Sequence, residues 1–166
     1  MKTQLEQLVQ HNKTMGYFCQ RWRDDCADVR ARLGPYVAKF LNNPSSKETE
    51  QIQALVIMDW YLRVNIPVWL ELIDLRAESA ALRARPAIAR WSDLAGIQPL
   101  LNVARKKAGA ARGAASGAAY DAAYDAAYGA AKKKLSATVA FLQNSAFEML
   151  DRCVMQDPLD ILKEML

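Results

Sequence analysis

Apolar side chains recur at alternating spacings of three and four residues through the first third of the chain. This spacing is typical of the a and d positions of a heptad repeat, so it predicts one long helix over residues 1–34. Gly34 and Pro35 are expected to end this helix, because glycine suits the position after a helix and proline cannot continue its interior. Asn12 lies on the seam, where it either fixes the register or marks a helix end or a solvated gap. The seam positions are Leu5, Leu8, Asn12, Met15, Cys19, Trp22, Cys26, Val29 and Leu33.

The same spacing resumes after a short polar connection and predicts a second helix over residues 45–75. Ser45 and Glu48 form a capping-box pattern at its beginning. Pro67 is expected to kink or split this helix, because it lacks the backbone N–H that a helix interior requires. The seam positions are Ile52, Leu55, Asp59, Leu62, Ile66, Trp69 and Ile73.

One charged residue, Asp59, falls on this second seam. Arg63 follows four residues later, in the orientation that favours an ion pair on a helix, so we interpret Asp59 as a paired carboxylate rather than a functional acid. Trp60, Tyr61 and Trp69 lie in a strongly apolar segment and are interpreted as packing residues rather than a stacking platform.

The pattern becomes irregular after this helix and then strongly helical again. Residues 76–99 contain two prolines and a glycine and predict a broken, basic connector with at most short helices. Residues 100–156 are expected to form an Ala-rich repeat helix and a C-terminal core helix. An Asp-Pro pair then introduces an amphipathic tail, residues 157–166, which docks either on the bundle or on a second copy of the chain.

The repeat itself reads in fours over residues 109–132 as GAAR, GAAS, GAAY, DAAY, DAAY and GAAK. Alanine favours a helix, whereas each glycine costs about 1 kcal/mol in a helix interior, so this helix needs tertiary packing. A four-residue repeat advances roughly 400° around a helix, so each column of side chains drifts by about 40° per repeat. We expect the small residues to admit a second backbone at close range and a right-handed crossing.

Together these patterns predict an all-α fold: a helical bundle with long antiparallel helices, formed by residues 1–166 as one domain. A hydrophobic content of 52% and a charged content of 24% are consistent with a sizeable core. The most apolar window, residues 54–73, is interrupted by charged residues, so no membrane association is expected. The seam of residues 1–34 is equally compatible with a homodimer.

The three cysteines and the first residues suggest where the protein works. Cys19 and Cys26 would lie roughly 10 Å apart on one helix, too far for a disulfide. No apolar run follows the N-terminal positive charge, so no secretory signal is expected. Both features predict a reducing, cytoplasmic location.

Positive charge is concentrated in the middle of the chain. Between Arg76 and Arg112 there are eight basic and two acidic residues, a net charge of +6 in a chain whose total is +4. This asymmetry is compatible with a nucleic-acid contact, an acidic protein partner or an ordinary solvated face.

Two sets of residues are candidates for binding. An amphipathic tyrosine and aspartate surface on the repeat is the leading candidate for a protein partner, although the tyrosines would equally serve to cover neighbouring helices. The alternative is a nucleic-acid site on the basic residues, with strongly salt-dependent affinity. The partner-binding candidates are Tyr120, Asp121, Tyr124, Asp125 and Tyr128, and the nucleic-acid candidates are Arg105, Lys106, Lys107, Arg112, Lys132, Lys133 and Lys134.

Catalytic and metal-binding patterns are absent from the sequence. His11 is the single histidine and is interpreted as a solvated residue, and there is no Cys-x-x-Cys, Glu-x-x-His or phosphate-binding loop. We therefore expect no enzymatic activity, no cofactor and no metal. A catalytic role would have to use scattered acids such as Asp59, Glu71 and Asp74.

The segments VIMDWYLRVNIPVWLEL and LSATVAFLQNSAFEMLDR, together with the Ala-rich tetrapeptide repeat between them, resemble a group of helical proteins from phage and prophage genomes that carry an A-A-x-x repeat in their middle section. The resemblance covers residues 50 to 155 or so. It implies a small phage accessory protein that binds a host or defence protein as an inhibitor or modulator. It carries no active-site residues over to this chain.

Overall fold

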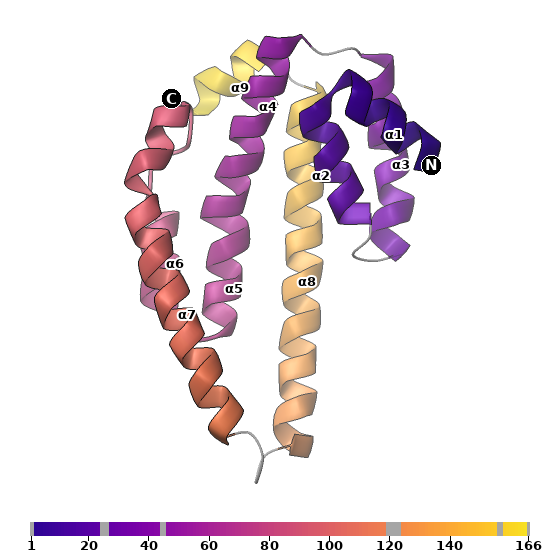
Figure 1. The fold of residues 1–166 in the computed structure, drawn as a ribbon. Coiled ribbons are helices and arrows are strands. Elements are labelled where there is room, and N and C mark those ends of the chain that lie inside the picture. Colours follow the sequence, from indigo (N-terminus) through magenta and orange to yellow (C-terminus); the bar gives the residue numbers. More distant parts are fainter. Residues whose placement is uncertain (1, 24–26, 44–45, 119–123, 156–157, 166) are drawn as a thin grey trace. The chain divides into compact units, whose positions relative to one another are not determined.

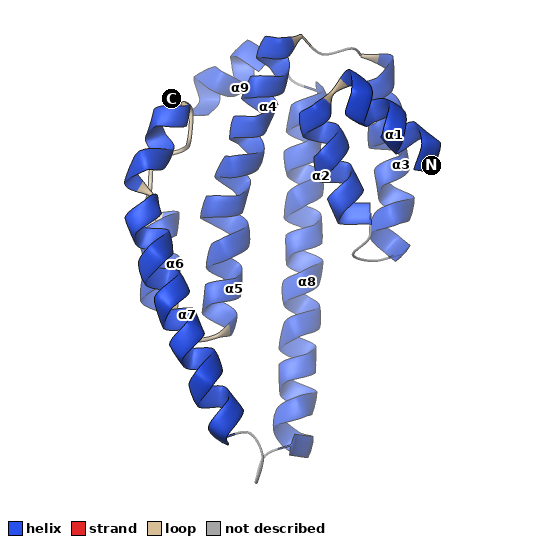
Figure 2. Ribbon diagram, in the orientation of Figure 1, coloured by secondary structure: helices blue, strands red, loops and turns tan. Residues whose placement is uncertain are grey.

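Helices account for almost all of the described chain. The computed structural model describes residues 2–23, 27–43, 46–118, 124–155 and 158–165, and no strand occurs within these ranges (Figure 1, Figure 2). The predicted all-α class is therefore confirmed. The elements are α1 Lys2–His11, α2 Lys13–Arg23, α3 Ala27–Asn42, α4 Lys47–Trp60, the π-helical turn η1 Tyr61–Asn65, α5 Ile66–Leu72, α6 Arg76–Arg83, the 3₁₀ turn η2 Trp91–Gly96, α7 Gln98–Ala118, α8 Tyr124–Met155 and α9 Pro158–Met165.

Contacts along the chain form two compact units. Unit 1 consists of Met1–Met58 and Phe147–Leu166, and unit 2 consists of Asp59–Ala146. Each unit has its own set of buried side chains. The expectation of a single domain over residues 1–166 stays a prediction.

The predicted single helix over residues 1–34 is wrong, because unit 1 begins with three separate helices, α1, α2 and α3. Asn12 makes the first break: its Oδ1 accepts the backbone N–H of Met15 at 2.9 Å, which caps the beginning of α2. The seam side chains are nevertheless buried where they are described, since the short helices turn the same faces inward. The heptad spacing thus identified the inward face and missed the turns of the chain.

The predicted helix end at Gly34 and Pro35 is also wrong, because α3 continues through both residues to Asn42. A side chain before proline would clash with the proline ring in helical geometry, and Gly34 has none. Pro35 is exposed, so water can hydrate the carbonyl oxygen that loses its helical partner. Burial of Val37 and Phe40 on the next turn favours the continued helix.

A chain of buried polar groups joins the elements of unit 1. Asn12 donates from Nδ2 to Oε1 of Gln53 in α4 at 2.7 Å. Gln53 in turn donates from Nε2 to the backbone carbonyl of Cys153 in α8 at 3.4 Å. Because both amides are buried and both use their donor and acceptor atoms, the break between α1 and α2 is tied to α4 and α8.

The second predicted helix has its expected break and a shifted beginning. Ser46 caps its beginning: Ser46 Oγ accepts the backbone N–H of Thr49 at 3.1 Å, and α4 begins at Lys47. Ser45, the first residue of the predicted capping box, lies outside the described residues. The helix divides before Pro67, where the π-helical turn η1 precedes α5 and Pro67 occupies the first turn of α5. The predicted kink or split at Pro67 is confirmed.

The later segments follow the expected order. The connector contains the short helix α6 and the turn η2, as its prolines and glycine predicted. In the tail, Ile161 and Met165 of α9 are buried in unit 1, so the tail docks on its own chain. Residues 98–118 and 124–155 are helical, and the close packing expected of the repeat stays a prediction.

Candidate functional site

The tyrosine and aspartate candidates lie mostly beyond what the structure describes. Tyr120 and Asp121 fall outside the described residues. Tyr124, Asp125 and Tyr128 belong to the first turns of α8, and their side chains fall outside the described part. The proposed surface on the repeat therefore stays a prediction.

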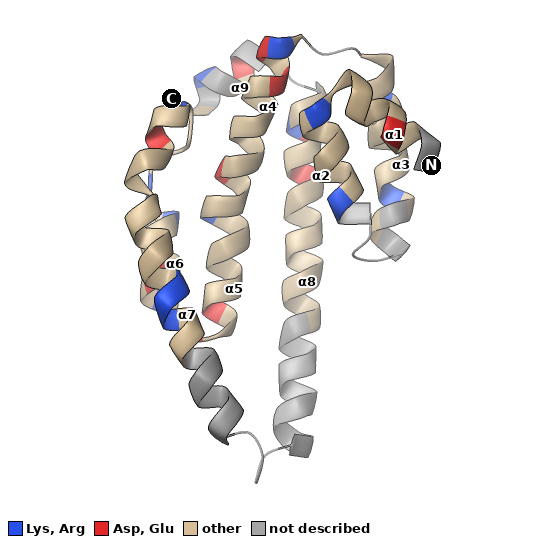
Figure 3. Ribbon diagram, in the orientation of Figure 1, with Lys and Arg blue, Asp and Glu red and all other residues tan. Residues whose placement is uncertain are grey.

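The basic candidates divide in the same way. Arg105, Lys106 and Lys107 are exposed on α7, where Figure 3 shows a band of basic residues. Arg112 belongs to α7 and Lys132–Lys134 belong to α8, with side chains outside the described part. Lys107 is engaged, because its Nζ forms an ion pair with Oε1 of Glu78 in α6.

Ion pairing within unit 2 leaves a surplus of positive charge. The unit contains 12 lysines and arginines and 7 aspartates and glutamates, which gives a net charge of +5. Unit 1 contains 10 lysines and arginines and 11 aspartates and glutamates, which gives a net charge of −1. Each carboxylate in the described part of unit 2 forms an ion pair with a basic residue of the same unit. The pairs are Asp59–Arg63, Glu71–Arg83, Asp74–Arg76, Glu78–Lys107 and Asp93–Arg90. The remaining positive charge of unit 2 is available to attract a negatively charged binding partner.

Asp59 is a structural acid, as its spacing from Arg63 predicted. Its two oxygens accept hydrogen bonds from Nε and Nη2 of Arg63, both at 2.6 Å. Oδ1 also accepts the backbone N–H of Ile88 at 3.0 Å. The hydrogen bond to Asp59 raises the pKa of Arg63, and this outweighs the opposing effect of partial burial. These contacts tie the last turn of α4 to η1 and to the segment between α6 and η2.

Glu78 holds α6 to α7. The hydrogen bond from Lys107 is the main reason that the pKa of Glu78 lies below its ordinary value. Glu78 is therefore ionised and neutralised by Lys107 at neutral pH. The interaction spans 29 residues of sequence and could not be read from helical spacing.

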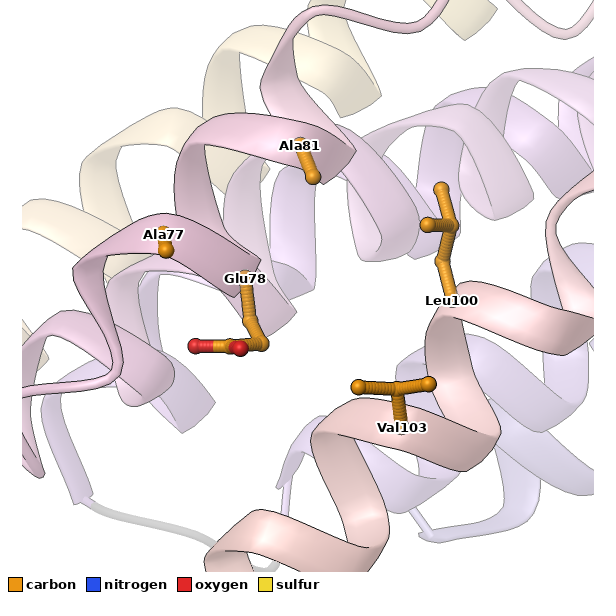
Figure 4. Close-up of a pocket in the computed structure, with 5 residues that line it drawn as sticks. All are labelled: Ala77, Glu78, Ala81, Leu100 and Val103. Carbon is orange, nitrogen blue, oxygen red and sulfur yellow. The ribbon is translucent and has the colours of Figure 1, made fainter.

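Beside this ion pair, α6 and α7 border a small apolar depression (Figure 4). Ala77 and Ala81 contribute small side chains from α6, and Leu100 and Val103 contribute larger ones from α7. Glu78 is the fifth lining residue. The depression has a volume of about 130 Å³, comparable with the cavity of about 150 Å³ that accommodates benzene in another protein. It has room for one large apolar side chain.

Large apolar side chains also reach solvent from unit 2. Trp91 is 52% exposed, Phe141 51%, Val103 49% and Trp69 40%. The interpretation of Trp69 as a packing residue is thus wrong in part, whereas Trp60 is buried and donates from Nε1 to Oγ of Ser145 at 3.0 Å. Trp91 sits between two prolines in the connector, and that irregular context was the available signal for its exposure.

The residues considered for catalysis do not converge. His11 is exposed, and its Nδ1 lies 2.8 Å from the backbone oxygen of Gln7 in the same helix. Glu71 accepts a hydrogen bond from Ser79 Oγ at 2.8 Å and pairs with Arg83. In the described ranges, no group of three or more histidine, cysteine or carboxylate side chains is arranged to hold a metal ion. Among the described helices, none is long and apolar enough to cross a membrane.

The fold and these surfaces define an all-α chain with a basic unit that carries exposed apolar side chains. Comparison with protein-family models, with curated proteins and with solved structures gave no match for it.

Proposed function

We propose that this chain is a non-enzymatic protein-binding module. The observation that supports the proposal is the set of large apolar side chains that unit 2 exposes to solvent. Six of the seven large apolar residues that are exposed in the described chain belong to this unit. Exposed tryptophan and phenylalanine cost solvation free energy in an isolated chain and are enriched at the centres of protein interfaces.

The polar groups of unit 2 favour binding over chemistry. Its described carboxylates are engaged in ion pairs, and Asp59 additionally binds a backbone N–H. General acid or base catalysis needs a titratable group that can reach a substrate. Ion-paired carboxylates held by arginine and lysine serve the packing of the unit instead.

The kind of partner follows from the resemblance to phage and prophage proteins. We propose a host or defence protein as the target, with this chain acting as its inhibitor or modulator in the cytoplasm. The buried cysteines Cys19 and Cys153 are both free thiols, which fits a reducing compartment.

Affinity capture from a lysate of the natural host tests this function. The tagged chain is expected to retain one protein stoichiometrically, identified by mass spectrometry. Trp91→Ser and Phe141→Ser are tested separately, and at least one of the two variants is expected to retain at least tenfold less of the partner protein. The reason is that a buried aromatic anchor dominates such interfaces. A Tyr124→Ala, Asp125→Ala variant tests the repeat surface in the same assay.

Tyr17 supplies the matched control, since it is 61% exposed but belongs to unit 1. Tyr17→Ser should leave the capture unchanged. Failure of the wild-type chain to retain any protein above background would contradict the proposed function.

Nucleic-acid binding is the second candidate, and the net charge of +5 on unit 2 favours it. Its test is the affinity for DNA and RNA oligonucleotides as a function of salt. A phosphate-binding surface should lose affinity steeply between about 50 and 200 mM salt. No binding at low salt would eliminate this candidate.

A further inference from the structure

From the depression between α6 and α7 we infer which partner chemistry this module recognises: an acidic protein segment that inserts one large apolar side chain. The inference rests on the proposed function and adds the location of the contact and the character of the partner.

Side chains from α6 and α7 face one another across the depression (Figure 4). Ala77 and Ala81 leave space on α6, and Leu100 and Val103 form apolar walls on α7. Val103 is 49% exposed, so water contacts a surface that a partner side chain would cover. Desolvating this apolar lining is favourable, and the volume of about 130 Å³ suits a phenylalanine or leucine side chain.

Positive charge beside the depression favours acidic residues next to the inserted side chain of the partner. Lys106 follows Val103 by three residues on α7, so the two are neighbours on the helix surface. Lys106 is exposed, and Lys107 on the next position is neutralised by Glu78. Because the described carboxylates of unit 2 are already paired within the unit, its net charge of +5 attracts an acidic segment from outside.

The lining favours a protein segment over a nucleic acid. Single-stranded nucleic acids bind aromatic faces on which bases stack, along a basic groove. Apart from Glu78, the side chains that line this depression are aliphatic, so it offers no aromatic face on which a base could stack. An apolar side chain fills an aliphatic depression of this kind, and an acidic neighbour in the same segment places its carboxylate near Lys106.

Fluorescence anisotropy with synthetic peptides tests the inference on the full chain. The probes are fluorescein-labelled 12-residue peptides with one central Phe or Leu among Glu and Ser residues. At least one is expected to bind, and replacement of its central residue by Ala should weaken binding at least tenfold. Replacement of its Glu residues by Gln should weaken binding several-fold at low salt.

Variants of the chain locate the contact. Ala81→Met fills the depression and should abolish binding, whereas Ala80→Met changes the exposed neighbour on the same helix and should not. Lys106→Glu should weaken binding several-fold, whereas Arg21→Glu makes the same charge change at an exposed position in unit 1 and should have little effect. Unchanged circular dichroism and melting temperature show that each variant is folded.

Three results would overturn the inference. The first is that no acidic peptide binds, and the second is that the Ala81→Met variant binds the peptide as tightly as the wild-type chain does. The third is that a 12-nucleotide oligo(dT) binds more tightly than the peptides and loses affinity in the same variants. Affinity capture from the host lysate distinguishes failure of the inferred site from failure of the proposed function. A stoichiometric partner that Ala81→Met still retains leaves the proposed function standing and removes this site. Absence of a captured partner removes the proposed function itself.

Discussion

Asp59 shows how one residue connects distant parts of the chain. Its carboxylate binds Arg63 four residues later and the backbone N–H of Ile88 29 residues later. Helical spacing predicted the first contact, because positions four apart on a helix are neighbours. The second contact depends on the return of the connector to the end of α4, which local sequence does not encode.

We expect Asp59→Ala to lower the free energy of unfolding by about 2–3 kcal/mol. The change removes charged hydrogen bonds and leaves the buried N–H of Ile88 without its acceptor. Urea denaturation followed by circular dichroism measures the effect. Glu148, an exposed carboxylate of α8, is the control: Glu148→Ala should change stability by no more than about 0.5 kcal/mol. Equal effects of the two variants would contradict the structural role of Asp59.

Asp74 is a residue in an unusual backbone conformation, with a φ of 62°. It follows Ile73, the C-cap of α5. The N–H of Asp74 donates to the carbonyl oxygen of Glu71 at 3.1 Å, and the N–H of Leu75 donates to that of Leu70 at 2.8 Å. These two bonds form a Schellman motif, whose left-handed position favours glycine. The aspartate therefore carries a small conformational cost.

Asp74→Gly is expected to raise stability by up to about 1 kcal/mol, because glycine adopts the left-handed conformation without a Cβ clash. The exposed ion pair with Arg76 that is lost contributes little. Asp74→Ala should instead lower stability, since alanine keeps the Cβ clash and loses the short polar side chain that makes the left-handed conformation tolerable for aspartate. Thermal melts of the two variants decide the matter, and a lower melting temperature for Asp74→Gly would refute the prediction.

At the scale of elements, the approach of α1 and α2 depends on one glycine. A Cβ on Gly16 would lie 2.5 Å from Cα of Val9 and 2.6 Å from its backbone nitrogen. Backbone atoms cannot yield as a flexible side chain can, so the two short helices can meet this closely only at glycine. The turn at Asn12 and this contact together replace the long helix that the heptad spacing predicted.

Gly16→Ala is expected to destabilise the chain by about 2 kcal/mol or more, because the two helices must move apart. Gly109→Ala provides the comparison, since a Cβ at Gly109 meets nothing within 4 Å in α7. That change should stabilise by about 1 kcal/mol through helix propensity alone. Urea denaturation of both variants gives the measurement, and a neutral effect at Gly16 would show that the close approach is wrong.

At the scale of the whole molecule, unit 1 holds several ionisable groups in their neutral form. Burial raises the pKa of the Cys153 thiol to about 12. Burial, with a smaller contribution from Cys153, does the same for Cys19. Burial first, and then the hydrogen bond that Tyr36 donates to Asp151 at 2.8 Å, raises the pKa of Tyr36 to about 12.

These pKa shifts predict a loss of stability in alkali. In the unfolded chain the thiols ionise near 9.0 and the tyrosine near 10.0, while in the fold all three ionise near 12. The stabilisation is complete below pH 9 and declines as the pH rises toward 12. We expect the urea midpoint of the reduced protein to fall over this interval, and Tyr36→Phe to reduce the part of the fall above pH 10. A midpoint that stays constant to pH 11 would contradict these pKa values.

Part of the candidate site was accessible from the sequence. The basic character of the connector and of α7 follows from composition, so the sequence alone drew attention to Lys106 and Lys107, and their role in binding stays a prediction. The depression was missed, because Ala77 and Val103 come from different helices and alanine carries no chemical signal of its own. Trp69 was misjudged because an apolar neighbourhood in sequence does not state which side of a helix is covered.

The sequence by itself determined the helical class, the inward faces of unit 1 and the Asp59–Arg63 pair, because helical periodicity and four-residue spacing depend on neighbours along the chain. Only the tertiary structure decided that the chain turns at Asn12 and remains helical through Gly34 and Pro35. At Asn12 a cap and a buried amide partner in α4 stabilise the turn. At Gly34 and Pro35 burial of the following residues stabilises the helix. Both outcomes depend on free energies contributed by residues that are distant in sequence, which a local pattern cannot contain.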